Sequence, residues 1–351
     1  MEQIGGHKLD NCNTIKAILM LLVIVYHSCV FWTGTWWDYP PSLSSKPLAL
    51  LAEWLNTFHV HAFTLISGYI YVYKINRGEY QNYKLFITKK IKRLIIPYLF
   101  VTAIWIVPIS ASLFHWDTKE LIRRYILCEE PSQLWFLWML FDVFILVWPV
   151  RKKINEKPKQ AYLYALGCYA IGILARKYIP NYYCIWSAFQ FMPYFILGMR
   201  IRDNHEQEKN TVVDTIPWYC WMVFDIALFF ALISLSEQNI LWWHRIFPIV
   251  RPLQSLVGSV MAWSCLQMIC SKYNLEKNKR IEMLIGYSMP IYMFHQQFIY
   301  FSIRFFDGVI APFFHAFISF GIAFWGSYVI CFLMSKSSIT RRLVGISDRI
   351  S

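Results

Sequence analysis

The chain has 351 residues, of which 57% are hydrophobic, 19% aromatic and only 16% charged. Charged residues make up about a quarter of an ordinary soluble domain, and a mean hydropathy of +0.38 over this length is too high for one water-soluble core. This composition excludes a soluble enzyme, a disordered tail protein and a disulfide scaffold. The net charge of +13 does not indicate a nucleic-acid partner, because Lys and Arg collect in membrane-protein loops for reasons of topology. We therefore predict an all-α polytopic membrane protein.

The apolar runs predict about ten transmembrane helices in one bundle. A helix needs roughly 20 apolar residues to cross the hydrocarbon core. Such runs occur near 14–33, 47–73, 94–114, 134–150, 161–175, 183–199, 216–235, 246–270, 284–302 and 309–334. The loops between them are short, so we expect a single integral-membrane domain over 1–351. The polar residues before the first run do not resemble a cleavable signal.

The positions of Lys and Arg predict the direction of these spans. With the amino terminus in the cytoplasm, segment 74–93 carries seven Lys or Arg residues and segment 151–159 carries five, whereas the outward loops carry one to three each. This positive-inside pattern predicts an even number of spans with both termini cytoplasmic. The nine cysteines are scattered, mostly in apolar stretches, so we expect buried free thiols and no metal site.

Eight ionisable side chains fall inside the apolar runs. Such a group costs several kcal/mol at membrane depth unless it is paired or hydrated, so each is a candidate for function. They are His27, Glu53, His59, His61, Asp142, Asp225, Arg251 and His295. A transporter or flippase for a glycan or a small polar solute explains this set as readily as an enzyme does.

Helical geometry relates three of the candidates. Lys16 and His27 lie eleven residues apart, which places both on one helix face about 16 Å apart along the axis. Lys16 is then at the cytoplasmic mouth and His27 past the midplane. His295 is expected at a similar depth in its own span, where the bundle interior can bring the two histidines together. A lone intramembrane histidine is, however, more often a packing residue than a catalyst.

The other ionisable residues have equally simple structural explanations. Glu53 and Arg251 both fall in the outward third of their spans, where a structural ion pair is as good an explanation as function. Asp142 and Asp225 fit hydrogen-bonded helix contacts. His59 and His61 point about 200° apart on a helix and cannot bind one metal ion together.

A basic stretch precedes the third span and admits two interpretations. Lys89, Lys90, Lys92 and Arg93 are either a topology anchor beside anionic lipid or a cytoplasmic site for a phosphate-bearing cofactor. The small-residue pair Ser67-Gly68 predicts a close helix–helix approach.

The opening of the chain resembles that of the acyltransferase-3 family of membrane O-acyltransferases. Leu9 and Asp10 are followed by Lys16 and, after ten further residues, by His27. The family has a Leu-Asp pair, then Arg, ten residues and His in its first span. Lys16 stands where the family usually has Arg, so the charge is kept and the bidentate guanidinium fork is lost.

Four further segments extend the resemblance along most of the chain. Residues 61–69 are similar to the family's Phe-rich segment that ends in Ser-Gly-Phe or Ser-Gly-Tyr, and residues 89–98 to its basic approach to the third span, with Arg-Leu and Pro-Tyr pairs. Residues 134–137 match its Leu-Trp-Phe-Leu, and residues 288–295 are similar to its late Ser, Tyr and His span. Each motif is short, but five in the family's order form a fairly specific signal.

The resemblance implies transfer of an acyl group, most often acetyl from acetyl-CoA, to a carbohydrate hydroxyl. Typical acceptors are O-antigen, capsule, exopolysaccharide or cell-wall glycan, which implies a bacterial inner-membrane enzyme. We therefore expect an O-acetyltransferase that acts on a surface polysaccharide or its lipid-linked precursor. Its partners would be a carbohydrate acceptor and membrane lipid, with the oligomeric state left open.

The same resemblance suggests roles for the candidate residues. The nucleotide end of acetyl-CoA is expected near Lys16 and the basic stretch 89–93. His27 is expected either to take the proton of a sugar hydroxyl or to accept the acetyl group itself. His295 would orient His27 or the acceptor, and Arg251 would stabilise the oxyanion. Glu53 and His61 are further candidates on the substrate side.

Overall fold

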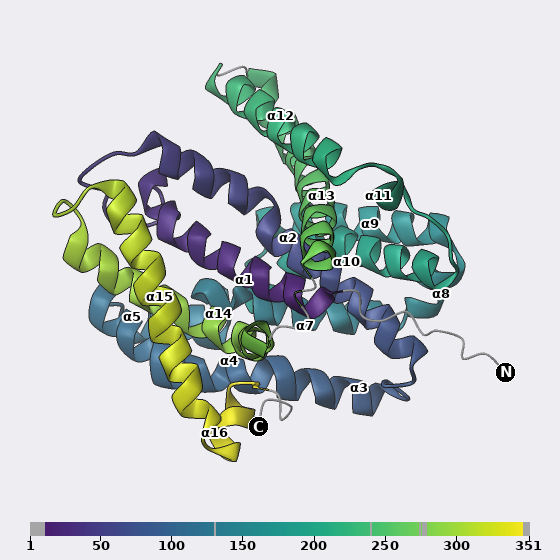
Figure 1. Cartoon of the computed structure of the whole chain (residues 1–351), viewed down its shortest axis with the longest axis horizontal. Helices are drawn as coiled ribbons and strands as arrows, with labels where there is room; N and C mark the ends of the chain where they lie inside the picture. Colours follow the sequence, from purple (N-terminus) through teal and green to yellow (C-terminus); the bar gives the residue numbers. More distant parts are fainter. Residues whose placement is uncertain (1–10, 130, 239–240, 274, 276–278, 347–351) are drawn as a thin grey trace.

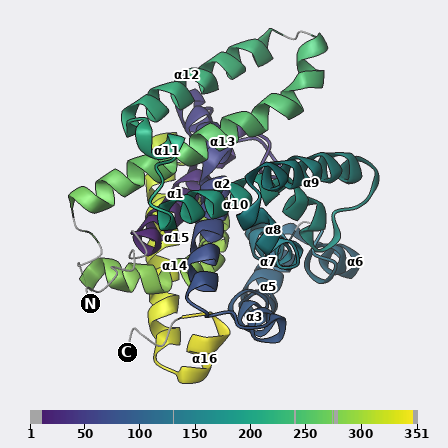
Figure 2. The same cartoon turned by 90° about the vertical axis from the view of Figure 1, so that its right-hand side faces the viewer.

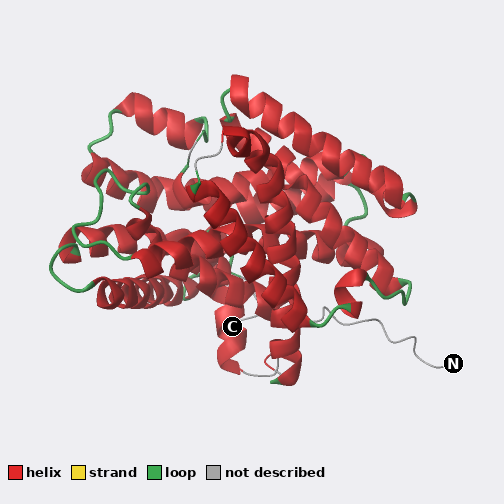
Figure 3. Ribbon diagram, turned by 90° about the horizontal axis from the view of Figure 1, so that it is seen from above, coloured by secondary structure: helices red, strands yellow, loops and turns green. Residues whose placement is uncertain are grey.

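The computed structural model describes residues 11–129, 131–238, 241–273, 275 and 279–346. Among these residues every regular element is a helix and no strand occurs (Figure 3). The α-helices are α1 (Cys12–Cys29), α2 (Lys46–Asn76), α3 (Tyr83–Lys90), α4 (Ile96–Val101), α5 (Val107–Phe114), α6 (Thr118–Leu121), α7 (Trp135–Val147), α8 (Arg151–Glu156), α9 (Pro158–Tyr178), α10 (Ile185–Glu206), α11 (Val212–Thr215), α12 (Trp218–Glu237), α13 (Leu241–Lys272), α14 (Lys279–Phe306), α15 (Pro312–Ser335) and α16 (Ser338–Leu343). Short 3-10 turns occur at η1 (Val30–Thr33), η5 (Ser132–Leu134) and η6 (Tyr182–Cys184).

Five helical stretches are long and apolar enough to cross a membrane. They are Cys12–Thr33, Tyr83–Phe114, Trp218–Ser236, Ile249–Lys272 and Pro312–Ser335, and they coincide with the first, third, seventh, eighth and tenth predicted spans. The other five predicted ranges are also helical, within α2, α7, α9, α10 and α14. The chain is thus an all-helical, multi-pass protein, as its composition predicted.

Three of the remaining five ranges are too short or too polar for reasons that their residues show. The helix α7 has only 13 residues, and polar side chains such as His59, His61 and Gln297 lower the hydropathy of α2 and α14. The count of ten spans and the single domain over 1–351 therefore stay predictions. So does the cytoplasmic location of both termini, since residues 1–10 and 347–351 lie outside the described residues, as does the Leu9-Asp10 motif.

Helix α1 lies at the centre of the bundle and has most of its surface covered. It packs against α2 on one side and against α14 and α15 on another, with α13 also in contact (Figure 1). Gly34, with φ of 74°, ends the η1 turn that continues α1. The helices α12 and α13 form a hairpin that projects from the rest of the bundle (Figures 1 and 2).

Helices α2 and α10 approach each other so closely that two glycines are required. A Cβ atom on Gly68 would lie 2.0 Å from the backbone oxygen of Phe195, and one on Gly198 would lie 1.8 Å from the backbone oxygen of Leu65. Real Cβ atoms do not occupy such positions, so each glycine lets one backbone rest on the other. This contact confirms the close approach predicted from Ser67-Gly68.

The third predicted span is a continuous helix with two widened turns. The π-helical turns η2 (Ile91–Ile95) and η3 (Thr102–Ile106) precede Pro97 and Pro108, which stand near the start of the α-helical segments that follow. Proline donates no backbone hydrogen bond and its ring clashes with the carbonyl four residues earlier, so the preceding turn widens. The basic residues Lys92 and Arg93 lie on the first of these widened turns.

Candidate active site

The two predicted catalytic histidines meet at the interface of α1 and α14. Nδ1 of His27 lies 3.2 Å from Nε2 of His295, and the ring centroids are 4.9 Å apart in an edge-to-face arrangement. The similar depth of the two residues had indicated such a meeting. The structure therefore brings together two imidazoles that lie far apart in the sequence.

The hydrogen-bond partners of the two rings assign one tautomer to each of them. Nδ1 of His295 lies 2.7 Å from the carbonyl oxygen of Tyr292, and Nδ1 of His27 lies 3.0 Å from that of Val23. A carbonyl oxygen only accepts, so in the neutral rings both Nδ1 atoms carry the proton. Nε2 of His295 then accepts from Nδ1–H of His27, which leaves Nε2 of His27 with an unshared electron pair.

This Nε2 atom is the reactive position of the pair. Among the described residues it has no hydrogen-bond partner, and His27 keeps 9% of its surface exposed while His295 keeps none. The rings of Tyr26 and Trp36 flank the imidazole at centroid distances of 4.8 and 5.8 Å. An oriented imidazole whose Nε2 has no hydrogen-bond partner among the described residues is suited to take a proton or to attack a carbonyl carbon.

A polar network holds the α14 side of the site in place. The Gln133 side chain donates to the carbonyl oxygen of Met293 at 2.8 Å and to Oε1 of Gln297 at 3.1 Å. The Tyr292 hydroxyl donates back to the Gln133 carbonyl oxygen. These bonds fix the start of α7 on α14 beside His295. Gln133 and Gln297 were not among the predicted site residues, although a polar pair directly after His295 in an apolar span is a usable signal.

The loop after α1 covers the histidine pair. Trp36 packs on Tyr300 at 5.3 Å between ring centroids. Further along the loop, Asp307 accepts hydrogen bonds from the backbone N–H of Ser42 at 3.0 Å and from its hydroxyl at 2.7 Å. The aromatic loop is thereby attached to the end of α14. Trp36 was not among the predicted site residues, because nothing in its local sequence pattern shows that the chain folds back over His27.

Lys16 lies at the opposite end of α1 among other cations. Its electrostatic neighbours are Arg93 and Lys74, which come from η2 and from the carboxyl-terminal part of α2. The predicted basic stretch therefore does approach Lys16. Lys74 also pairs with Glu79 at 2.8 Å. Together these residues form a basic end of the bundle, about 16 Å along α1 from His27.

The four basic residues of the predicted donor site differ in their surroundings. Lys90 is buried, with its ammonium 3.4 Å from the ring centroid of Phe144 and 3.2 Å from the Tyr80 hydroxyl, to which it donates. Lys89 donates to the backbone oxygen of Glu79 at 2.9 Å. Lys92 and Arg93 are exposed. Lys90 thus serves as a cation held by aromatic rings, while Lys92 and Arg93 are accessible to a ligand.

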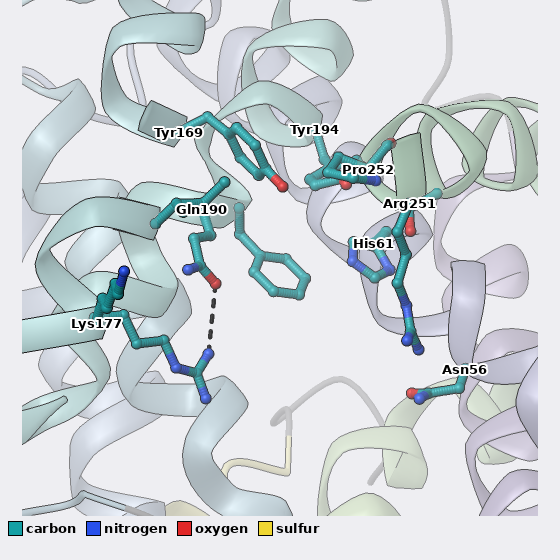
Figure 4. Close-up of a pocket in the computed structure, with 12 residues that line it drawn as sticks. Asn56, His61, Tyr169, Lys177, Gln190, Tyr194, Arg251 and Pro252 are labelled. Atoms are coloured by element: carbon teal, nitrogen blue, oxygen red, sulfur yellow. Dashed lines mark hydrogen bonds between the residues drawn. The ribbon is translucent and has the colours of Figure 1, made fainter. Parts of the chain in front are cut away.

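A separate cavity of about 510 Å³ lies between α2, α9, α10 and α13. His61 and Arg251 both line it, together with Asn56, and Figure 4 shows these three side chains on one wall opposite Gln190 and Lys177. His61 stacks on Phe191 with ring centroids 4.6 Å apart. The structure therefore places Arg251 on this cavity and not in contact with the histidine pair, and its role at the oxyanion stays a prediction.

The other ionisable residues of the apolar runs are distributed elsewhere. Glu53 is exposed, and no ion pair joins it to Arg251 among the described residues. Asp225 is fully buried and accepts a hydrogen bond of 2.9 Å from the Trp54 indole, which makes it a helix–helix contact. His59 packs on Tyr26 at 4.7 Å between ring centroids. One carboxylate oxygen of Asp142 has no partner among the described atoms.

Comparison with known proteins assigns the chain to a class and a family. Residues 9–336 match a family model described as an acyltransferase domain, so nearly the whole chain forms a domain of this class. It belongs to the acyltransferase-3 family. The predicted family and the prediction of an enzyme are confirmed, and the enzyme is favoured over the transporter or flippase.

The curated relatives are distant and match only in part. The chain is similar to the glucans biosynthesis protein C of Salmonella paratyphi B, of Salmonella heidelberg and of Salmonella enteritidis, with 24% identity over 164 residues in each case. The matched part covers 42% of this chain, and the chain spans 42% of the length of each of these relatives. No solved structure gives a significant match.

Proposed function

We propose that this acyltransferase moves an acetyl group from acetyl-CoA to a hydroxyl of a cell-surface polysaccharide or of its lipid-linked precursor, in the inner membrane of a bacterium. The observation that carries the proposal is the His27–His295 pair, in which backbone carbonyls place a proton on each Nδ1 and Nε2 of His295 accepts from Nδ1–H of His27. The glycan acceptor is further supported by the relatives, whose printed name assigns them to glucan biosynthesis.

In this mechanism Nε2 of His27 takes the proton of the attacking hydroxyl. The hydroxyl oxygen forms a bond to the thioester carbonyl carbon, and the carbon–sulfur bond then breaks. The coenzyme A thiolate leaves and takes the proton from the imidazolium, so that the acetylated sugar and the free thiol remain. His295 accepts the hydrogen bond from Nδ1–H of His27 throughout and keeps Nε2 aimed at the reacting oxygen.

A second route uses the same atom as a nucleophile. Nε2 of His27 attacks the thioester carbonyl carbon, and coenzyme A leaves as the thiolate. The sugar hydroxyl oxygen then bonds to the acetyl carbon, the carbon–nitrogen bond to Nε2 breaks, and the freed Nε2 takes the hydroxyl proton. The separation of the cationic end from His27 along α1 suits this route when the acceptor stays on the outer side. Brief reaction of the protein with radiolabelled acetyl-CoA, without acceptor, distinguishes the two, because only the second leaves label on His27.

The donor is proposed to bind at the cationic end of the bundle. Acetyl-CoA carries several phosphate groups, and Lys and Arg are their usual protein partners. Lys16, Lys74 and Arg93 come together there, and the exposed Lys92 lies on the same widened turn as Arg93. The thioester would extend from this end along α1 toward His27.

The proposed function is tested by the acetyl content of the surface polysaccharide. A strain that lacks the gene is complemented with the wild-type chain or with an empty vector, and the O-acetyl groups of the purified polysaccharide are measured by proton NMR. We expect acetylation with the wild-type chain and its loss without it. Equal acetyl content in both strains would contradict the proposed function.

A further inference from the structure

We propose that the cavity between α2, α9, α10 and α13 is a binding subsite for a negatively charged sugar, so that the preferred acceptor is an acidic glycan. This inference rests on the proposed function and specifies its acceptor. The site is distinct from the His27–His295 pair and from the cationic end near Lys16, and it would hold a carboxylate- or phosphate-bearing unit that neighbours the reacting sugar.

The charges that line the cavity all have one sign. Arg176 and Lys177 reach it from the end of α9, and Arg251 reaches it from α13. None of the described residues that line it carries a carboxylate. Figure 4 shows Lys177 and Arg251 on opposite sides of the open space. Three cations around a volume of about 510 Å³ create a positive electrostatic potential. An anionic ligand bound in the cavity would be stabilised by this potential.

The remaining lining groups favour a sugar over a simple anion. Tyr194 and the stacked pair His61 and Phe191 present aromatic rings, on which the apolar face of a pyranose can pack. The amide of Asn56 can donate and accept hydrogen bonds, as hydroxyl groups require, whereas the Gln190 amide accepts from Arg176 at 3.4 Å and donates to the Gly172 carbonyl oxygen at 3.3 Å. Nδ1 of His61 is buried without a hydrogen-bond partner among the described residues, which leaves one more polar atom for a ligand.

The cavity lies at the His27 end of the bundle and away from the donor site. His59, two residues before His61 on α2, packs on Tyr26 next to His27. His61 therefore has the same height as the reactive imidazole, on another side of α2. Lys74 lies thirteen residues further along this helix, about 20 Å away. The cavity cations are thus not needed by the phosphates of acetyl-CoA.

The thickness of α2 defines which part of the acceptor the cavity would hold. A helix with its side chains is about 10 Å across, so a sugar in the cavity cannot present its own hydroxyl to Nε2 of His27. A neighbouring sugar of the same chain can do so. The cavity therefore selects the acceptor through a remote unit, and its loss is expected to change the KM for the acceptor with little change in kcat.

A second cavity, of about 610 Å³, does not offer the same chemistry. It is lined by residues of the loop before α6, among them Asp117, and by Lys119, Glu120 and Arg123. Arg123 pairs with Glu120 at 2.7 Å and with Glu129 at 2.7 Å. Its guanidinium is thereby balanced by two carboxylates, and a negatively charged sugar gains little there.

The test compares an acidic acceptor with its neutral counterpart. Purified protein in nanodiscs of zwitterionic lipid is given radiolabelled acetyl-CoA and either a glucuronate-containing oligosaccharide or the same oligosaccharide after carboxyl reduction. R251Q and R176Q each remove one cavity cation, and R304Q removes an exposed cation from α14 outside the cavity as the matched control. Each Arg→Gln substitution removes a charge-assisted hydrogen bond from a guanidinium to the carboxylate of the acceptor. We expect this loss to raise the KM for the acidic acceptor about tenfold.

Each outcome has a defined meaning. The inference is supported if R176Q raises the KM for the acidic acceptor, leaves that for the neutral one unchanged and keeps kcat within about twofold, if R251Q raises the same KM, and if R304Q behaves as wild type. It is overturned if the two acceptors react equally well with wild type and the variants change neither. It is also overturned if the variants change only the response to added phosphatidylglycerol, since the cavity would then bind a lipid headgroup. Absence of acetyl transfer to any acceptor would count against the proposed function itself.

Discussion

Nδ1 of His27 and Nε2 of His295 lie 3.2 Å apart across the interface of α1 and α14. The carbonyl oxygens of Val23 and Tyr292 require a proton on each Nδ1, so the contact fixes the free electron pair on Nε2 of His27. A base oriented by a third group through its other ring nitrogen is the arrangement found in many acyl-transfer enzymes. Here the orienting group is a second, fully buried imidazole.

This relationship predicts that His295 acts on the chemical step and not on acceptor binding. H295F keeps a ring of similar size and removes both nitrogens, so Nδ1–H of His27 keeps only the Val23 carbonyl as acceptor and the imidazole loses the contact across the helix interface that orients it. We expect kcat to fall by about 100-fold or more with little change in either KM. Steady-state kinetics of acetyl transfer with the purified protein measure both values.

A conservative variant separates orientation from packing at the same position. In H295Q the amide oxygen can still accept from Nδ1–H of His27 and the amide nitrogen can still donate, so kcat should recover by about tenfold or more over H295F. If H295Q and H295F are equally impaired, or if both keep wild-type kcat, the orienting role is wrong.

The donor site is tested by comparing acetyl-CoA with acetyl-pantetheine, which lacks the nucleotide phosphates. R93Q removes an exposed guanidinium beside Lys16. We expect the KM for acetyl-CoA to rise about tenfold, because a charge-assisted bond to phosphate is lost, and the KM for acetyl-pantetheine to stay unchanged. K159Q, which removes an exposed cation at the start of α9, is the control. An equal rise in the KM for both donors would show that Arg93 does not bind the phosphates of acetyl-CoA.

The α2–α10 contact predicts that a glycine-to-alanine substitution within it lowers thermal stability, whereas one at an open position of another helix does not. In G198A the new Cβ would meet the Leu65 backbone oxygen at 1.8 Å, so the helices must move apart, at a cost of about 1 to 3 kcal/mol. In G321A on α15 the new Cβ meets nothing within 4 Å, so stability should be kept or slightly raised. The midpoint of thermal unfolding in detergent reports both. Identical midpoints for G198A and wild type would contradict the described packing.

Much of the architecture could be predicted from hydropathy because the apolar runs are long. All ten predicted ranges are helical, and residues such as Ser67 and Gly68 mark a tight contact by their size alone. The widened turn at Ile91–Ile95 was not predicted, although Pro97 provides its cause. The aromatic cage of Lys90 was also missed, since Phe144 approaches from a distant part of the chain.

The candidate site could be predicted only in part, because the sequence shows relations within one helix but not which helices become neighbours. His27 and Lys16 lie on one helix, so their relation follows from the helical repeat, and His295 stands out as an ionisable group in an apolar span. Gln133, Trp36 and the walls of the cavity depend on which helices become neighbours, and no local pattern encodes that. The cavity cations Arg176 and Lys177 were visible in the sequence only as loop charges.

The most direct test of the central claim is the rate of acetyl transfer by H27A. Purified wild type and H27A in nanodiscs are given radiolabelled acetyl-CoA and acceptor polysaccharide in a single turnover, with size-exclusion profiles and acetyl-CoA affinity as controls for folding. We expect H27A to bind acetyl-CoA as wild type does and to transfer acetyl slower by a factor of about 10² to 10⁴. A folded H27A protein that transfers acetyl at the wild-type rate would contradict the account.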